Sequence, residues 1–130
     1  MKFARIWFTI AGWWGIVTLL PLFFMFNLIG HSNPPMINHP EYYYGFLSVA
    51  LAWQIAFLII AREPVTYRAL MIPATLEKLG YATVCIVLFA QQRILLSGFL
   101  FGLTDLALGI GFVVAYSKTS DKSLARTSVR

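Results

Sequence analysis

Four long apolar stretches alternate with short polar segments along this chain. Three of them, residues 6–29, 43–61 and 94–116, hold a single charged residue among them, Asp105. A helix needs about 20 residues to cross the hydrocarbon core of a bilayer, so each stretch is long enough. None shows the alternation of a strand, and an open sheet is excluded in lipid. The pattern therefore predicts membrane-spanning helices.

A third span in chain order is predicted over residues 73–92, where the apolar run is shorter and two charged residues precede it. Glu77 and Lys78 fall in the first two turns of this helix. A helix dipole favours Glu there, and a Lys side chain can extend to the headgroups. We therefore expect an interfacial pair at Glu77 and Lys78. The alternative is a cytoplasmic gate that reaches toward Arg62 or Arg68.

The segments between the spans are short, so helices that follow each other in sequence should be antiparallel. The run Gln91-Gln92-Arg93 predicts a tight turn, and Pro21 predicts a kink within the first span. Residues 117–130 are rich in Ser, Thr, Lys and Arg and predict a disordered basic tail. The fold expected for residues 1–116 is an all-α bundle of four antiparallel transmembrane helices.

Composition and charge support the same class of protein. Of 130 residues, 59% are hydrophobic and 12% are charged, whereas ordinary soluble domains carry about 25% charged residues. If the N-terminus is cytoplasmic, Arg93 is the only basic residue on the outer side of the membrane. The inner side then holds the remaining basic residues: Lys2, Arg5, Arg62, Arg68, Lys78, Lys118, Lys122, Arg126 and Arg130. This asymmetry predicts a multi-pass protein of the plasma (inner) membrane with both termini cytoplasmic. Anionic lipid accounts for the net charge of +5, so no nucleic-acid partner is expected.

The most informative polar residue is Asp105, the twelfth of the 23 residues in its span. A charge at the bilayer midplane costs roughly 2.5–3.5 kcal/mol on insertion scales, which makes such a residue a candidate for function. Gly98, Gly102, Asp105 and Gly109 are spaced 4, 3 and 4 and share one helix face. Gly98 and Gly102 form a GxxxG pair that allows close helix packing. We therefore expect Asp105 to face a packed seam between helices.

Two interpretations of Asp105 remain open at this point. It is either a structural carboxyl, protonated or hydrogen-bonded to a neighbour, or a proton-coupled or ligand-anchoring carboxyl. Because Lys78 and Arg93 are both expected near the interfaces, no basic residue is expected at its depth. We therefore expect a neutral Asp105, whose replacement by Asn preserves folding.

Other polar and aromatic residues lie near the same depth. Thr18 and Gln54 are near the centres of their spans, and a Gln54–Asp105 hydrogen bond is one interpretation. Trp13, Trp14 and Trp53 are either packing bulk or an aromatic wall around an apolar ligand. The candidate ligand-binding or proton-linked residues are Asp105, Gln54, Trp53, Tyr81 and Thr83.

Metal and cofactor sites have little support in the sequence. His31, His39 and Glu41 are suitable metal-ligand types, but they lie in a proline-broken loop and match no metal motif. Cys85 is the single cysteine, which excludes a disulfide within the chain. There is no HExxH, P-loop or GxGxxG motif, and no His lies within a span to ligate haem. We expect neither a metal nor a cofactor.

Three short motifs accompany this layout: Pro-Glu-Tyr-Tyr-Tyr-Gly-Phe at 40–46, Ala-Arg-Glu-Pro at 61–64 and Leu-Glu-Lys-Leu-Gly-Tyr at 76–81. With the length, short loops and basic inner side, they resemble small bacterial inner-membrane proteins of the DoxX-like kind. The resemblance covers the membrane part and implies a four-helix bundle. Small multidrug transporters also have four helices, but they carry a Glu in the first helix that is absent here. The emopamil-binding fold needs several intramembrane acids, and only Asp105 is expected to be deep.

Three classes of function follow. The preferred one is a non-enzymatic membrane protein, either an accessory subunit of a larger complex or a binder of a small apolar or lipid-like ligand. The alternatives are a small proton-coupled transporter that uses Asp105 and a membrane-embedded enzyme acting on lipids or quinones. Few convergent catalytic groups are present, so catalysis is not expected, and a homo-oligomer remains open. A cavity that exposes Asp105 would favour ligand binding or transport, whereas a dry seam would favour a scaffold.

Overall fold

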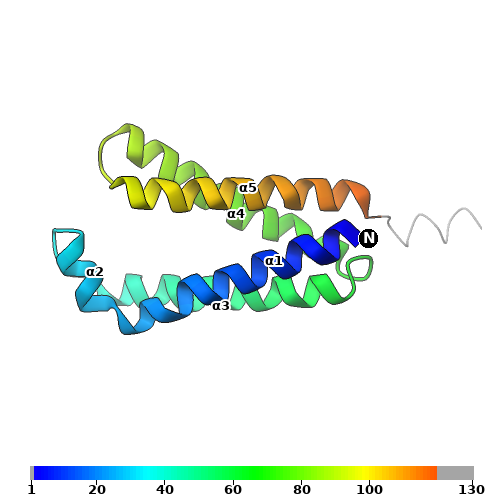
Figure 1. Ribbon diagram of the computed structural model, residues 1–130, viewed down its shortest axis with the longest axis horizontal. Coiled ribbons are helices and arrows are strands. Elements are labelled where there is room, and N and C mark those ends of the chain that lie inside the picture. Colours follow the sequence, from blue (N-terminus) through cyan, green and yellow to red (C-terminus); the bar gives the residue numbers. More distant parts are fainter. Residues whose placement is uncertain (1, 120–130) are drawn as a thin grey trace, which may run out of the picture.

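The computed structural model describes residues 2–119 of the chain. These residues form helices and no strand, and four helical segments are long and apolar enough to cross a membrane. The four segments are Lys2–Phe24, Pro40–Arg62, Arg68–Ala90 and Leu96–Lys118. They run alternately in opposite directions (Figure 1). The predicted all-α bundle of four antiparallel spans is confirmed.

The helical elements differ from the predicted ranges by only a few residues at most ends. In chain order they are α1 (Lys2–Leu19), η1 (Leu20–Phe24), α2 (Phe26–Ser32), α3 (Pro40–Arg62), η2 (Arg68–Leu70), α4 (Met71–Ala90) and α5 (Leu96–Lys118). Apolar runs locate the lipid-facing part of a helix, whereas helical hydrogen bonds continue through the polar residues at either end. This is why α1 begins at Lys2 and α3 at Pro40, ahead of the predicted apolar runs.

The first span changes its helical geometry at the predicted proline. Pro21 lies in the first turn of the 3₁₀ helix η1, directly after α1 ends at Leu19. Proline has no N–H to donate to the preceding turn, which explains why the α-helical ladder stops there. The chain then bends at Met25 and continues as the short helix α2. The span therefore ends at Phe24, five residues before the predicted end.

The four long helices form two hairpins. In the first hairpin α1 packs along α3, and in the second α4 packs along α5, while α3 and α4 make little contact with each other. In Figure 1 the hairpins lie close together at the end that carries the N-terminus and separate toward the other end. The second hairpin closes at the predicted tight turn, where the Arg93 N–H donates to the Leu88 carbonyl over 2.8 Å. Gln92 takes a left-handed backbone conformation there, with φ of 58°.

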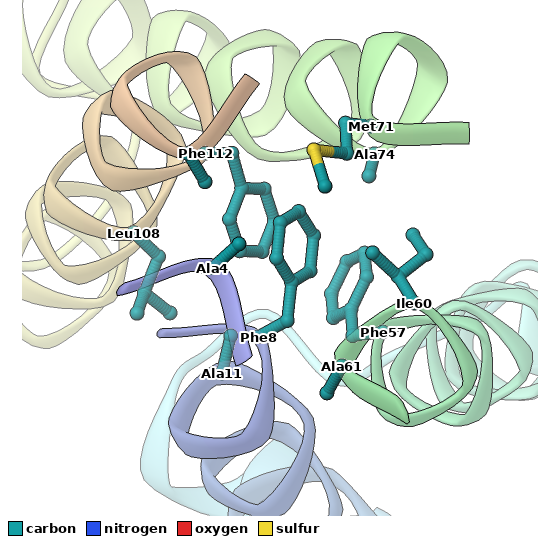
Figure 2. Packing of buried hydrophobic residues seen from close by; sticks show 11 residues of the cluster. Ala4, Phe8, Ala11, Phe57, Ile60, Ala61, Met71, Ala74, Leu108 and Phe112 are labelled. Atoms are coloured by element: carbon teal, nitrogen blue, oxygen red, sulfur yellow. The ribbon is translucent and has the colours of Figure 1, made fainter. Parts of the chain in front are cut away.

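An aromatic core joins the two hairpins at the N-terminal end (Figure 2). The ring of Phe8 on α1 stacks on that of Phe112 on α5, with centroids 4.1 Å apart. Phe57 on α3 meets Phe112 edge-on at 4.9 Å. Met71 and Ala74 bring α4 into the same cluster, and all five side chains are fully buried. All four long helices are therefore held together at this end.

The beginning of the predicted disordered tail is in fact ordered. Helix α5 continues to Lys118, and Thr119 is buried. The Arg68 Nε donates to the Thr119 carbonyl over 2.7 Å, and its guanidinium lies 3.7 Å from the centre of the Tyr116 ring. These contacts with Arg68 hold the end of α5 in place although the segment has few apolar residues. The predicted disorder is therefore wrong for residues 117–119. Residues 120–130 lie outside the described part of the chain.

Replacing Arg68 by methionine should reduce the stability of the bundle. The variant loses a charged hydrogen bond and a cation–π contact, which together contribute about 1–2 kcal/mol. The measurement is the melting temperature in mild detergent, with Arg5→Met as the control because Arg5 is exposed on α1. Equal melting temperatures for the two variants would show that the Arg68 contacts do not hold the end of α5.

Candidate functional site

The seam between α4 and α5 brings the charged residues together. A Cβ added at Gly102 would collide with the side chain of Cys85, and one at Gly109 would lie 2.6 Å from Leu79 Cδ2. These two glycines therefore permit the close packing of α4 on α5. Gly98 does not belong to the seam, because its nearest side chain within 4 Å is Ile94 of the same chain segment. Among the described residues of this chain, Gly98 therefore does not make the helix contact that was predicted for it.

Lys78 lies inside this seam and not at the membrane interface. Its side chain is only 5% exposed, and its Nζ lies 3.3 Å from Asp105 Oδ1 and 3.6 Å from Glu77 Oε2. The cause is Gly109, which stands where Lys78 enters the seam and has no side chain to block it. From there the Lys78 side chain extends along α5 by one helical turn to Asp105. The interfacial placement predicted for Glu77 and Lys78 is therefore wrong.

This contact also overturns the expectation that Asp105 has no basic neighbour. Glu77, Lys78 and Asp105 form one group, here called the charged triad. The Glu77 and Asp105 side chains are 20% and 16% exposed, so all three charges are largely removed from solvent. Charges in such surroundings are stable only when they are paired, because desolvation is costly for each ion. Asp105 thus belongs to a network with formally two carboxylates and one ammonium.

A cavity of about 110 Å³ lies between the two hairpins, beside the charged triad. One water needs roughly 10–15 Å³ of such space, so this central cavity is large enough for more than a single water. All four spans contribute to its wall. The lining residues are Trp14, Gly15, Thr18, Leu19, Leu22, Phe46, Ala50, Gln54, Glu77, Lys78, Tyr81, Phe101 and Asp105. The wall is mostly apolar and aromatic, and the polar groups are concentrated on α3, α4 and α5.

Gln54 is a buried polar residue of the cavity wall with an unused acceptor. It is fully buried, its Nε2 donates to the Ala50 carbonyl over 2.8 Å, and its Oε1 has no hydrogen-bond partner. Its amide lies against Gly15 of α1, where any side chain would collide with it. An unsatisfied buried acceptor costs about 1–3 kcal/mol. The predicted Gln54–Asp105 hydrogen bond is not formed, although both residues line the central cavity.

The other predicted site residues, Tyr81, Trp53 and Thr83, lie in three different surroundings. Tyr81 lines the central cavity, where its ring stacks on Phe46 with centroids 5.7 Å apart. Trp53 lines a neighbouring pocket that also includes Tyr81, and its ring lies 6.3 Å from that of Phe57 in the core. Thr83 is exposed on the outer face of α4, and its hydroxyl donates to the Leu79 carbonyl. The structure therefore brings Asp105, Gln54 and Tyr81 together and leaves Thr83 outside.

Trp13 and Trp14 of α1 differ in their relation to the central cavity. Trp14 lines the central cavity, whereas Trp13 does not line it and is 55% exposed. Thr18 contributes to the same wall one turn beyond Trp14, with its hydroxyl donating to the Trp14 carbonyl over 2.8 Å. An aromatic wall is thus present, and it consists of Trp14 together with residues on α3, α4 and α5.

The three candidate metal ligands, His31, His39 and Glu41, do not converge. The Nδ1 of His39 lies 3.2 Å from Glu41 Oε1, while the Nδ1 of His31 lies 2.7 Å from the Asn27 carbonyl of its own helix. Within residues 2–119 no group of three or more His, Cys, Asp or Glu residues is arranged to hold a metal ion. The chemistry of the molecule is therefore concentrated at the charged triad and the central cavity.

Comparisons with known proteins add no family to this description. No protein-family model, no curated protein and no solved structure matches the chain. The resemblance to DoxX-like proteins therefore stays a prediction.

Proposed function

We propose that this protein binds a small amphiphilic molecule in the central cavity between its two hairpins. The observation that carries the proposal is the wall of this cavity, which combines aromatic side chains with the charged triad and the unpaired Gln54 Oε1. Small-molecule sites are typically concave and mostly apolar, with a few convergent polar groups. An amphiphile matches both parts of the wall.

The alternative of an inert scaffold is less well supported. A structural seam is closely packed, as α4 and α5 are around Gly102. At Asp105 the helices leave a cavity instead, and a buried acceptor next to it has no partner. Intramembrane ionisable residues that face a cavity are usually retained for function. The structural features at this position are therefore those of a binding site.

A quenching experiment tests the proposal, because Trp14 lines the cavity and Trp13 does not. The probe is a nitroxide-labelled single-chain amphiphile titrated into protein in nonionic detergent. We expect a saturable component of tryptophan quenching that disappears in Trp14→Phe and persists in the matched variant Trp13→Phe. Thr18→Leu, which fills part of the cavity, should weaken this component. Quenching that rises in simple proportion to the amphiphile in every variant would refute binding in the cavity.

We also propose that the bundle lies in the plasma membrane with both termini cytoplasmic. Lys78 no longer counts as a loop charge because it is buried, which reduces the predicted asymmetry from nine against one to eight against one. A bias of this size remains strong under the positive-inside rule.

The topology gives a direct prediction for reporter fusions. A reporter attached after Arg130 and one inserted within residues 33–38 should give opposite compartment signals, because an odd number of the four spans separates these positions. Paired reporters with complementary compartment preferences, one active inside and one active outside, provide the control. Two signals from the same side would contradict the arrangement of the spans.

A further inference from the structure

The central cavity contains more negative than positive formal charge. Among the described residues that line it, the titratable groups are Glu77, Lys78 and Tyr81 on α4 and Asp105 on α5, while α1 and α3 contribute none. Cys85 packs nearby against Gly102, in the seam and outside the cavity lining. One ammonium can balance only one of the two carboxylates. In a largely desolvated site, the second carboxylate requires a further positive charge.

Hydrogen-bond donors are also too few for the acceptors at this site. Lys78 Nζ donates to Asp105 Oδ1, but Glu77 Oε2 at 3.6 Å has no hydrogen-bond partner. The fully buried Gln54 Oε1 has none either. Two residues of the cavity wall, Gln54 on α3 and Glu77 on α4, therefore each carry a buried oxygen that has no hydrogen-bond donor. What would complete this site is a group that carries positive charge or donates hydrogen bonds.

The aromatic rings near the triad differ in their relation to the cavity. The Lys78 Nζ lies 5.4 Å from the centre of the Phe57 ring. Phe57 is not part of the cavity wall, whereas Trp14, Phe46, Tyr81 and Phe101 are. Aromatic faces attract organic cations, most strongly where water is excluded. The wall is thus suited to a cationic head with apolar substituents.

We propose that the ligand is a lipophilic organic cation, and that it competes with a proton for the carboxyl groups of Glu77 and Asp105. This inference rests on the proposed function and names the chemical class of its ligand. In the unliganded cavity one carboxyl carries a proton and the other pairs with Lys78. When the cation enters, the O–H bond of that carboxyl breaks, the proton leaves to water, and the carboxylate pairs with the cation. One positive charge enters and one leaves, with no covalent bond to the ligand.

Calorimetry with a permanent cation tests this exchange. The probe is decyltrimethylammonium, which has no proton to release, and the matched neutral probe carries a tert-butyl group in place of the trimethylammonium head. Titrations of the full-length protein in nonionic detergent are run in two buffers of different ionisation enthalpy, which gives the number of protons released. We expect release of about one proton per bound cation. By linkage, raising the pH by one unit should tighten cation binding by up to about tenfold where the carboxyl is protonated.

Variants identify the groups involved. Asp105→Asn and Glu77→Gln should each abolish the proton release and weaken cation binding by at least about tenfold, because Lys78 then balances the single remaining carboxylate. The two variants together keep the test valid if one of them fails to fold. Glu41→Gln removes an exposed acid outside the cavity and should behave as the unmodified protein.

The outcomes separate this inference from the function on which it rests. Cation binding without proton release, or proton release that persists in both triad variants, would overturn the exchange. Equal binding of the neutral and cationic probes would overturn the cation preference while leaving amphiphile binding intact. If the nitroxide amphiphile also shows no saturable quenching of Trp14, the proposed function itself fails.

Discussion

Replacing Lys78 by methionine is expected to destabilise the bundle by about 3–5 kcal/mol, because the variant leaves two carboxyl groups in a largely desolvated site without their common partner. Methionine is close to lysine in length and fits the same path beside Gly109, so the loss reflects charge and not volume. The Nζ that is removed lies 3.3 Å from Asp105 Oδ1 and 3.6 Å from Glu77 Oε2. The free energy of unfolding in mixed detergent micelles is the quantity to measure.

A second substitution shows whether the charge network is responsible. In the double variant Lys78→Met with Asp105→Asn, only Glu77 remains as an acid, so the double variant should be more stable than Lys78→Met alone. Replacing both members of a buried ion pair is often nearly neutral, whereas removing one member is strongly destabilising. Lys2→Met, at an exposed position at the start of α1, is the control for loss of a lysine. A double variant less stable than Lys78→Met would contradict the pairing of Lys78 with Asp105.

The spans and their order could be predicted because they depend on properties that are local in the sequence. Hydrophobic length decides which segments cross lipid, and Pro21 and the Gln91-Gln92-Arg93 turn mark interruptions that backbone chemistry imposes locally. The arrangement of α4 against α5 followed from the shortness of that turn. None of these conclusions requires knowledge of which side chains meet.

The inward position of Lys78 was missed because depth along a helix was judged without its rotation. A lysine two turns into a helix is long enough to reach the headgroups, and this reach is what favours an interfacial position. The buried residues of α4 are Met71, Ala74, Lys78, Ala82 and Cys85, spaced 3, 4, 4 and 3. This is the periodicity of one buried helix face, and it places Lys78 on the seam. The sequence alone does not single out this face, because α4 also carries large apolar residues such as Leu76 and Val84 at exposed positions.

Nothing in the sequence predicted the central cavity. Gln54 and Asp105 line the same cavity, and the distance between their helices depends on how the hairpins separate beyond the Phe8–Phe57–Phe112 core. That separation is a tertiary property, set by where large and small side chains of four helices meet. Gly12 and Gly15 of α1 were overlooked for a related reason, since their importance lies in the Leu58 and Gln54 side chains that occupy the space beside them.

A leucine at Gly102 is expected to destabilise the second hairpin by about 3 kcal/mol, at the upper end of the usual penalty for overpacking. A Cβ at this position would collide with the Cβ of Cys85, close to the backbone of α4, where no flexible side chain can move away. Helices α4 and α5 would have to separate, and the contact between Lys78 and Asp105 would weaken with them. Leucine is tolerated by lipid, so insertion into the membrane should be preserved while the melting temperature in detergent falls.

Gly98→Leu is the matched control, since it makes the same substitution one turn away on the same helix. A Cβ at Gly98 meets only Ile94, at 3.5 Å, which is an ordinary van der Waals contact. We therefore expect Gly98→Leu to melt close to the unmodified protein and Gly102→Leu to melt well below it. The GxxxG pattern by itself predicts damage at both positions, because it assigns both glycines to one interface. Equal losses for the two variants would favour that pattern, with Gly98 packed against a second copy of the chain, and would contradict a seam that involves Gly102 and Gly109 alone.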